Sequence, residues 1–305
     1  MKKVQVISYS QSGQLHSVIA SFCAPLAVSA ARGQVELIDT PIEPLAPFPY
    51  PWRFYDFFDT MAEAVLDRGC AIKPVTVAPD ADLVILAYTV WFLSPSLPVA
   101  AFLNSEAAKG LAGKPVITLI ACRDMWLMAQ ERVKEKLASL GARHLDNVVL
   151  TDQGKSVHSF VTTPRWLFTG KKDAFWFFPP AGVAAEEITA AARFGERLAV
   201  ALAQNEETGN RPLLSGLGAA RVAGKLIASE KIAVKIFRPW SRLMAWAGPP
   251  GSLARRAVIS VYILFLLILI VIGVPVNLVK NALTSRRDPE KTRAERRYYQ
   301  APSGE

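Results

Sequence analysis

The chain of 305 residues has few of the side chains that build metal centres and disulfides. Its only cysteines and histidines are Cys23, Cys70, Cys122, His16, His144 and His158, and they lie far apart. This spacing matches neither a zinc-binding CxxC pair nor a disulfide framework, so the sequence predicts no metal site. No apolar signal region follows Met1-Lys2-Lys3, which predicts that the N-terminal domain stays in the cytoplasm.

The chain also lacks the glycines and the lysine of the common nucleotide-binding loops. The apolar run Val4–Ile7 is followed by Tyr9-Ser10-Gln11-Ser12-Gly13-Gln14 and then by the amphipathic stretch Leu15–Ala31. One glycine without a lysine excludes both the dinucleotide fingerprint and the P-loop. A strand that ends in hydroxyl residues before a helix instead suits a phosphate monoester, held by N–H and O–H groups. The alternative is an ordinary turn in which Ser10 or Ser12 caps the helix.

Apolar, β-branched runs recur along the first half of the chain. After Val4–Ile7 they occupy residues 35–38, 83–87, 115–120 and 145–150, and the stretches between them are long enough for helices. Runs without polar alternation indicate strands buried on both faces, which is typical of a parallel sheet with helices on either side. The predicted fold class is therefore α/β, with a doubly wound, five-stranded parallel sheet.

The phosphate loop and the βαβ series together resemble the flavodoxin-like proteins, whose hydroxyl-rich loop holds the phosphate of FMN. The resemblance implies the strand order 2-1-3-4-5 and FMN as the cofactor. It places the site at the carboxyl ends of the strands, in the loops after strands 1, 3 and 4. The cofactor-binding residues expected in the first of these loops are Ser10, Gln11, Ser12, Gly13, Gln14 and Leu15.

The loops after strands 3 and 4 carry further candidate site residues. For flavin contact these are Tyr88, Thr89, Val90, Trp91 and Phe92 after strand 3, and Ala121, Cys122 and Arg123 after strand 4. Aromatic side chains can stack on an isoalloxazine ring, although Trp91 and Phe92 could equally be core residues beneath the loop.

The same loops carry three of the candidate catalytic residues, and the segment 151–183 carries the fourth, His158. Arg123 could offset the charge of a reduced flavin or bind a substrate anion, and its alternative role is a surface ion pair. Asp124 is the expected N-cap of the next helix, which runs to Leu140. The candidate catalytic bases are Tyr88, Asp124 and His158.

Two irregular segments are expected to cover the site. Pro41–Trp52 is too rich in proline for regular structure and is expected to form a lid near the edge of strand 2. Residues 151–183 are rich in aromatic and basic residues and form an insertion near the last strand, as in long flavodoxins, or a β-hairpin over the core. Ala184–Gln204 is expected to be the closing helix of an FMN-binding domain at residues 1–205.

The remainder of the chain is basic and contains a long apolar run. Residues 257–279 carry no charge over 23 positions, enough for about 35 Å of helix, and are predicted to span or re-enter a bilayer. Residues 211–256 hold nine Lys and Arg against Glu230 alone, and residues 280–305 hold seven against four acidic residues. Residues 1–210 therefore have a net charge of about −2, from 19 basic and 21 acidic residues.

This distribution favours an anionic leaflet of the inner, cytoplasmic membrane as partner over nucleic acid. It divides the C-terminal part into a basic amphipathic segment at 206–256, the apolar helix at 257–279 and a basic polar tail at 280–305. Within the first of these, residues 216–246 are expected to form interfacial helices, or else a linker packed on the domain.

Four segments resemble the flavodoxin-fold aromatases of dialkylresorcinol biosynthesis, often labelled dialkylresorcinol condensing enzymes. They are residues 9–15, 91–98, 123–130 and 164–166, and the similarity covers roughly residues 1–280. It implies oxidation of an alkyl cyclohexanedione to a resorcinol, a hydrophobic substrate and a ketosynthase of the same pathway as partner. A homodimer is a further expected assembly.

Three classes of function follow for this chain. The favoured one is a membrane-anchored FMN oxidoreductase that acts on a lipid-like substrate. The alternatives are an electron-transfer flavoprotein that serves a membrane partner and a flavin-free scaffold.

Overall fold

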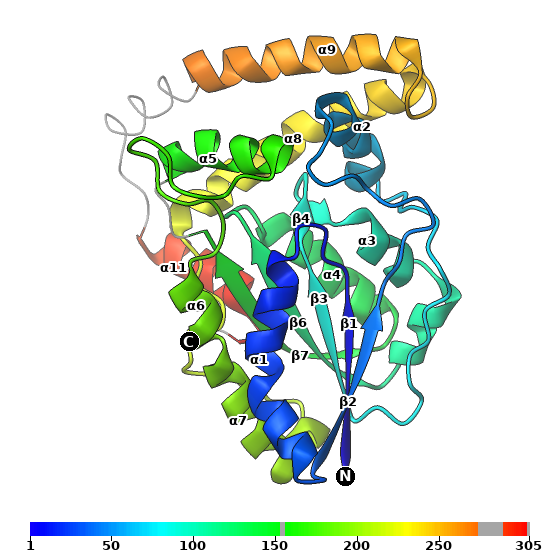
Figure 1. Ribbon diagram of the computed structural model, residues 1–305, viewed down its shortest axis with the longest axis vertical. Helices are drawn as coiled ribbons and strands as arrows, with labels where there is room; N and C mark the ends of the chain where they lie inside the picture. The colour runs from blue at the N-terminus through cyan, green and yellow to red at the C-terminus, as the bar shows by residue number, and fades with distance from the viewer. Residues whose placement is uncertain (153–155, 274–288, 304–305) are drawn as a thin grey trace.

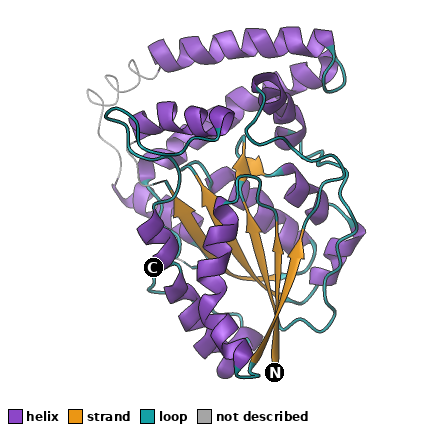
Figure 2. Ribbon diagram, viewed as in Figure 1, coloured by secondary structure: helices purple, strands orange, loops and turns teal. Residues whose placement is uncertain are grey.

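The computed structural model describes residues 1–152, 156–273 and 289–303. Its centre is a five-stranded parallel sheet in the order β2-β1-β3-β6-β7 (Figure 2). The strands are β1 (Lys2–Ser8), β2 (Val35–Pro41), β3 (Leu83–Tyr88), β6 (Pro115–Cys122) and β7 (Arg143–Thr151). Counted without the short pair β4 and β5, this is the order 2-1-3-4-5, so the predicted flavodoxin-like sheet is confirmed. All six residues of β3 are buried, as its unbroken apolar run predicts.

Helices cover both faces of the sheet. On one face, α1 (Gln14–Ala31) and α7 (Ala192–Ala203) bury Phe22 and Phe194 against each other and the strands. On the other face, α3 (Leu97–Leu103) and α4 (Leu127–Ser139) pack on the sheet. The remaining elements of the domain are α2 (Phe54–Val65), β4 (Val90–Trp91), β5 (Ser94–Pro95), α5 (Ser156–Thr169), α6 (Ala185–Ala190) and two 3₁₀ helices (Glu106–Leu111, Glu206–Thr208).

Helices α1 and α7 approach each other backbone to backbone. A Cβ atom at Gly195 of α7 would lie 1.9 Å from the carbonyl oxygen of Phe22, so only glycine fits there. The single closing helix predicted over Ala184–Gln204 is in fact two helices, α6 and α7, separated at Ala191. Helix α6 has no buried residue, whereas α7 buries a full apolar face, so the break lets α7 follow α1.

Helices α8 and α9 lie at the end of the molecule toward which the strands point, and α11 lies beside the sheet (Figure 1). Helix α8 (Gly224–Ala247) packs on α2 and α4, and α9 (Leu253–Ile268) crosses α2 and α8 before a π-helical turn, Leu269–Gly273. Helix α11 (Pro289–Gln300) returns to α8. The predicted interfacial segment at 216–246 thus contains one long helix that packs on the domain.

Two helices are long and apolar enough to cross a membrane by length and composition alone. One is α1, which covers the sheet. The other is Leu253–Val271, in which 17% of the 18-residue apolar window is buried. The apolar helix begins four residues before the predicted start at residue 257. Its predicted part at 274–279, and residues 280–288 of the predicted tail, lie outside the described residues.

Candidate functional site

A cavity of about 280 Å³ lies at the carboxyl edge of the sheet. It is close to the lower end of the range of about 300–1,000 Å³ that is usual for small-molecule sites. The loops after β1, β3 and β6 meet there, as the rule for parallel sheets predicts. Eleven of the fourteen predicted cofactor-binding residues line it: Gln11, Ser12, Gln14, Leu15, Thr89, Val90, Trp91, Phe92, Ala121, Cys122 and Arg123.

The loop after β1 leaves a group of polar atoms without partners. Within the described part of the chain, the amide N–H groups of residues 10–16 donate to no other residue. The hydroxyl oxygen of Ser10 is also buried without a partner. Gly13, at φ 82°, is the N-cap of α1, and no side chain caps this helix, so the alternative of a serine-capped turn is wrong. The first turn of α1 has no acidic residue, and the helix dipole therefore favours an anion at this loop.

The two glutamines of this loop hold the segments that cover the cavity. The Gln11 side-chain amide donates to the carbonyl oxygen of Pro49 over 2.8 Å. The Gln14 side-chain oxygen accepts from the amide of Val183 over 3.2 Å. The proline-rich segment and the segment after β7 are therefore each hydrogen-bonded to the start of α1. The side chains of Gln11 and Gln14 already have partners within the protein.

The cover itself comes from both segments that the sequence marks as unusual. The proline-rich segment contributes Tyr50 and Trp52 to the cavity, and α5 contributes Thr163, Trp166 and Leu167. The insertion at 151–183 is mainly this helix and a loop, so the alternative of a β-hairpin is wrong for the described residues, apart from one bridge between Phe175 and Phe178.

Aromatic rings form one wall of the cavity. The ring of Trp91 meets those of Phe48, Trp52 and Tyr9 edge to face, with centroids 5.1, 5.4 and 6.0 Å apart. Trp91 is only 8% exposed yet lines the cavity, so it is both a core residue and a wall of the site. These flat apolar surfaces suit a planar aromatic ligand.

The short hairpin formed by β4 and β5 has strained backbone at its tip. Phe92 and Leu93 lie at φ 48° and 60°, a region that residues other than glycine rarely adopt. Two consecutive positive φ values match the type I′ turn of two-residue hairpins. The turn directs the Phe92 ring onto that of Phe57 in α2, with centroids 4.8 Å apart, and both rings line the cavity. Such strain is usually retained where it shapes a site.

In the part of the chain that the structure describes, two charged residues line the cavity, Arg123 after β6 and Asp152 after β7. The Nε of Arg123 donates to the Ser159 hydroxyl over 2.9 Å, and its guanidinium lies 4.6 Å from the centre of the Phe160 ring. An Asp152 oxygen accepts from the Gly182 amide over 3.1 Å. Arg123 therefore belongs to the cavity, and it is not merely part of a surface ion pair.

None of the three candidate catalytic bases lines the cavity. Tyr88 is fully buried, and its hydroxyl donates to Gln130 on the α4 face of the sheet. Burial raises the pKa of Tyr88 well above its usual value. The ring of His158 packs edge to face on Phe178, away from the cavity-lining residues. Asp124 does not line the cavity either, and burial raises its pKa.

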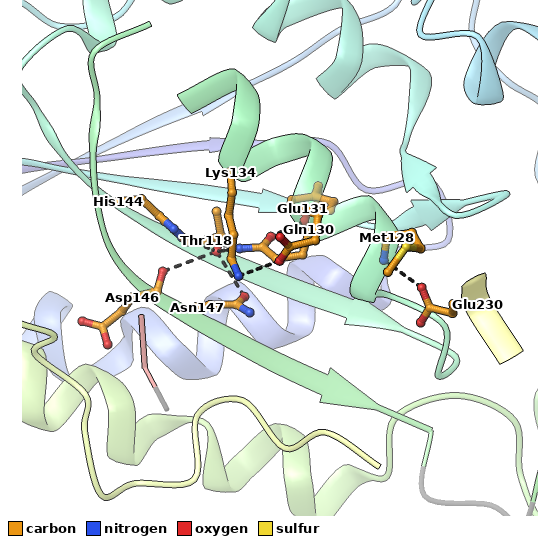
Figure 3. Close-up of polar contacts among 10 residues, drawn as sticks. Thr118, Met128, Gln130, Glu131, Lys134, His144, Asp146, Asn147 and Glu230 are labelled. Carbon is orange, nitrogen blue, oxygen red and sulfur yellow. Dashed lines mark hydrogen bonds and ion pairs between the residues drawn. The ribbon is translucent and has the colours of Figure 1, made fainter. Parts of the chain in front are cut away.

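The partner of Tyr88 belongs to a buried polar network (Figure 3). The Gln130 amide donates to the Thr118 hydroxyl over 2.9 Å, and this hydroxyl lies 3.0 Å from His144 Nε2 and 3.1 Å from Asn147 Oδ1. Burial lowers the pKa of His144 to about 4, so the ring is neutral. Apart from the side-chain nitrogen of Asn147, which is buried without a partner among the described residues, these polar groups bond to one another, and the network engages the hydroxyl of Tyr88 and the ring of His144.

The similarities to known proteins are similarities of three-dimensional structure. No model of a protein family matches the chain, and no curated protein matches it. A flavoprotein from Lactobacillus acidophilus in complex with FMN is 14% identical, over 49% of this chain and 93% of its own, with a TM-score of 0.39. A WrbA-like flavodoxin from Agrobacterium tumefaciens is 9% identical, over 67% and 99%, with a TM-score of 0.38.

A flavone reductase is 13% identical, over 70% of this chain and 66% of its own, with a TM-score of 0.35. At these values the similarities carry no argument about function. The fold is flavodoxin-like. That statement rests on the sheet order and on the placement of the helices on both faces.

Eight described cavity residues were not named individually from the sequence. Seven of them lie in the two segments expected to cover the site, Tyr50 and Trp52 in one and Asp152, Thr163, Trp166, Leu167 and Gly182 in the other, and Phe57 lies outside both. Asp152 directly follows the last strand at the same carboxyl edge, so the rule that located the other loops could have found it. Phe57 and Gly182 reach the cavity through tertiary packing, which no local pattern encodes. Within the described residues, no three His, Cys, Asp or Glu side chains form a group that could hold a metal ion.

The cap of α4 differs from the prediction. Trp126 is the N-cap residue, and no side-chain hydrogen bond caps the helix from that position or from Asp124. Instead, Glu230 of α8 accepts from the amides of Leu127 and Met128 over 3.0 and 2.7 Å (Figure 3). A carboxylate from a distant helix therefore does the capping, and it ties α8 to the loop that carries Arg123.

The buried Glu230 makes stability depend on pH. Burial outweighs its backbone hydrogen bonds and raises its pKa from 4.5 to about 7. Between these values the folded chain binds more protons than the unfolded chain, so the free energy of unfolding falls as the pH rises. We expect Glu230→Gln to remove a loss of about 3 kcal/mol between about pH 5 and about pH 8, measured by urea unfolding. Glu186→Gln, at an exposed position in α6, should keep the wild-type slope, and an unchanged slope in Glu230→Gln would contradict this role.

Proposed function

We propose that the cavity binds FMN and that the protein is an FMN-dependent oxidoreductase. The observation that carries this proposal is the set of unpartnered donors at the start of α1, where seven amides and the Ser10 hydroxyl face no partner. The Thr89 hydroxyl oxygen, in the loop after β3, is also buried without a partner. A phosphate monoester would satisfy the α1 donors without a lysine, and the adjoining aromatic wall suits a flat ring system.

The residues present therefore fit FMN. Residues 10–15 would hold the phosphate, and residues 89–92 and 121–123 would contact the ring system. Bound FMN would supply a two-electron acceptor at the carboxyl edge of the sheet. Trp52 and Trp166 come from the two covering segments and would exclude water from the reacting atoms.

We propose that the substrate is hydrophobic, of the alkyl cyclohexanedione type, and that it reaches the site from a membrane. Aromatisation of such a ring removes one hydride and one proton. Among the described residues, Asp152 is the only carboxylate that lines the cavity, and we assign it the role of proton acceptor. Arg123 would orient an enolate or dione oxygen by its positive charge. The apolar wall of the cavity, including Phe57, Trp91 and Leu167, suits the alkyl part.

The membrane part of the proposal rests on exposed apolar and basic side chains. Val261 and Leu264 of α9 are 58% and 60% exposed, and Val271 of the following π-helical turn is 69% exposed. Cavity-lining Phe57 and Phe92 also pack on the cluster formed by α2, α8 and α9, so the apolar surface continues from the cavity to these helices. We further propose that the catalytic domain faces the cytoplasm, that a ketosynthase supplies the dione and that the chain forms a homodimer.

A spectrum of the protein purified in detergent tests this function. We expect a visible flavin spectrum, release of FMN on denaturation and bleaching when an alkyl cyclohexanedione is added without oxygen. Bleaching by NAD(P)H but by no dione would indicate an electron carrier. A colourless protein that does not take up added FMN would contradict the proposal and favour a scaffold.

A further inference from the structure

Helix α11, which follows the apolar run, packs on the domain that precedes this run. In α11, Glu295 pairs with Lys231 of α8 over 3.0 Å, and the Tyr298 ring lies 5.8 Å from the Lys134 ammonium of α4. Tyr299 is 7% exposed. Helix α11 is thus held by contacts with α8 and with α4.

The last described residues reach the sheet itself. Ser303 is 2% exposed, and its hydroxyl donates to the Asp146 carboxylate over 2.8 Å and accepts from the Asn147 amide. Asp146 and Asn147 are fully buried in β7. Both polar partners would lose hydrogen bonds inside the protein if this segment left, and such a loss is costly. The segment is therefore an integral part of the fold.

The first half of α9 is docked along the domain. Arg255 is 1% exposed, and its guanidinium pairs with the carboxylates of Glu63, over 2.9 Å, and Asp59 in α2. Ile259 and Tyr262, one and two turns further on, are buried against the same cluster as Phe58. Separating α9 from α2 would leave Arg255 and two carboxylates without partners, so this contact fixes the direction of the helix across α2 and α8 (Figure 1).

Most of the exposed side chains of α9 are apolar, and several exposed side chains of α8 are basic. Exposed apolar side chains recur at helical spacing, at Val261, Leu264, Leu267 and Ile268 of α9 and at Val271 of the following π-helical turn, and Trp246 at the end of α8 is 83% exposed. The exposed positions of α8 include Lys235, Arg238 and Arg242. Exposed apolar side chains on α9 together with exposed cations on α8 complement an anionic bilayer, with the apolar side chains among the acyl chains and the cations at the headgroups.

We infer that residues 253–273 lie in the plane of the membrane interface and do not form a single crossing, so that α11 stays on the same side of the bilayer as the flavodoxin-like domain. The inference deepens the proposed membrane association and rests on it. A single crossing would put α11 on the opposite side and would break its contacts with α4, α8 and β7. It would also turn α9 away from α2 at the buried Arg255.

Cysteine labelling of the full chain in sealed membrane vesicles tests the sidedness. Two exposed positions are each replaced by cysteine, Glu186→Cys in α6 and Arg296→Cys in α11, and the parent chain with Cys23, Cys70 and Cys122 gives the background. We expect an impermeant maleimide to label both positions in inside-out vesicles and to lose both labels in right-side-out vesicles. Labelling of the two positions in opposite orientations would overturn the inference and leave the membrane association intact.

Quenching in vesicles of phosphatidylethanolamine and phosphatidylglycerol tests the depth. A fluorophore at Val261→Cys, Leu264→Cys or Ile268→Cys should be quenched most by lipids brominated near the headgroup, at all three positions alike. A steady gradient of depth from 261 to 268 would overturn the in-plane arrangement. Absence of binding to these vesicles would overturn the membrane association itself, which distinguishes the two failures.

Discussion

The Ser12→Asp variant is expected to purify without flavin and with its fold intact. Ser12 lines the cavity one residue before the N-cap of α1, where we place a phosphate that carries about −1.5 to −2 charges. Two unit charges at about 4 Å repel by about 4 kcal/mol at an effective dielectric constant of about 20, enough to weaken binding more than about 100-fold. FMN content after purification and FMN titration of the apoprotein measure the effect.

The same substitution should not destabilise the apoprotein. An acidic side chain near the N-terminus of a helix stabilises it by about 0.3–1 kcal/mol, and α1 has no acidic residue in its first turn. The apoprotein of the variant should therefore melt at the wild-type temperature or slightly above it. In the Ser12→Asn variant the side chain has the shape of aspartate without its charge, and this variant should keep most of its bound FMN. Equal FMN affinity in Ser12→Asp and wild type would rule out a phosphate at this loop.

The Asp152→Asn variant is expected to keep FMN and to lose turnover. The amide preserves a side-chain oxygen that can accept from Gly182, so the loop geometry should be retained. It cannot take up a proton from the substrate, and loss of a general base lowers the rate by about 10²–10⁴-fold. The rate of flavin bleaching by an alkyl cyclohexanedione in single turnover measures this loss.

Asp124→Asn is the matched control for this experiment. Asp124 is the first carboxylate after β6, and it does not line the cavity. Its removal should leave the bleaching rate within a few-fold of wild type. The reverse result, with Asp152→Asn active and Asp124→Asn inactive, would return the role of base to Asp124.

The sheet and most of the cavity could be predicted from the sequence because their signals are local. Unbroken apolar runs mark the buried strands, and the hydroxyl-rich loop before α1 marks the anion site. Tyr88 was predicted as a site residue but does not line the cavity, and a local rule accounts for its position. It continues the face of Val84 and Leu86 in β3, and alternation along a strand places its side chain on the α4 side of the sheet.

The other errors come from contacts between distant segments. The cap of α4 is Glu230, about 100 residues further along the chain, so the local pattern at Asp124 could not reveal it. The docking of α9 depends on Arg255 meeting Asp59 and Glu63, and an apolar run by itself does not show whether one of its faces has a protein partner. Such pairs become visible only when the fold is known.

The glycine contact between α1 and α7 has a consequence for how this fold can vary. The contact between Phe22 and Gly195 holds α1 and α7 together on one face of the sheet. The inserted segment begins after β7, a strand of the sheet, and ends before α6 and α7. Residues 156–183 therefore form a cassette between two anchored points. Exchange of this cassette could alter which substrates enter while the anion site at the start of α1 keeps its position, because α1 is held by α7 and not by the cassette alone.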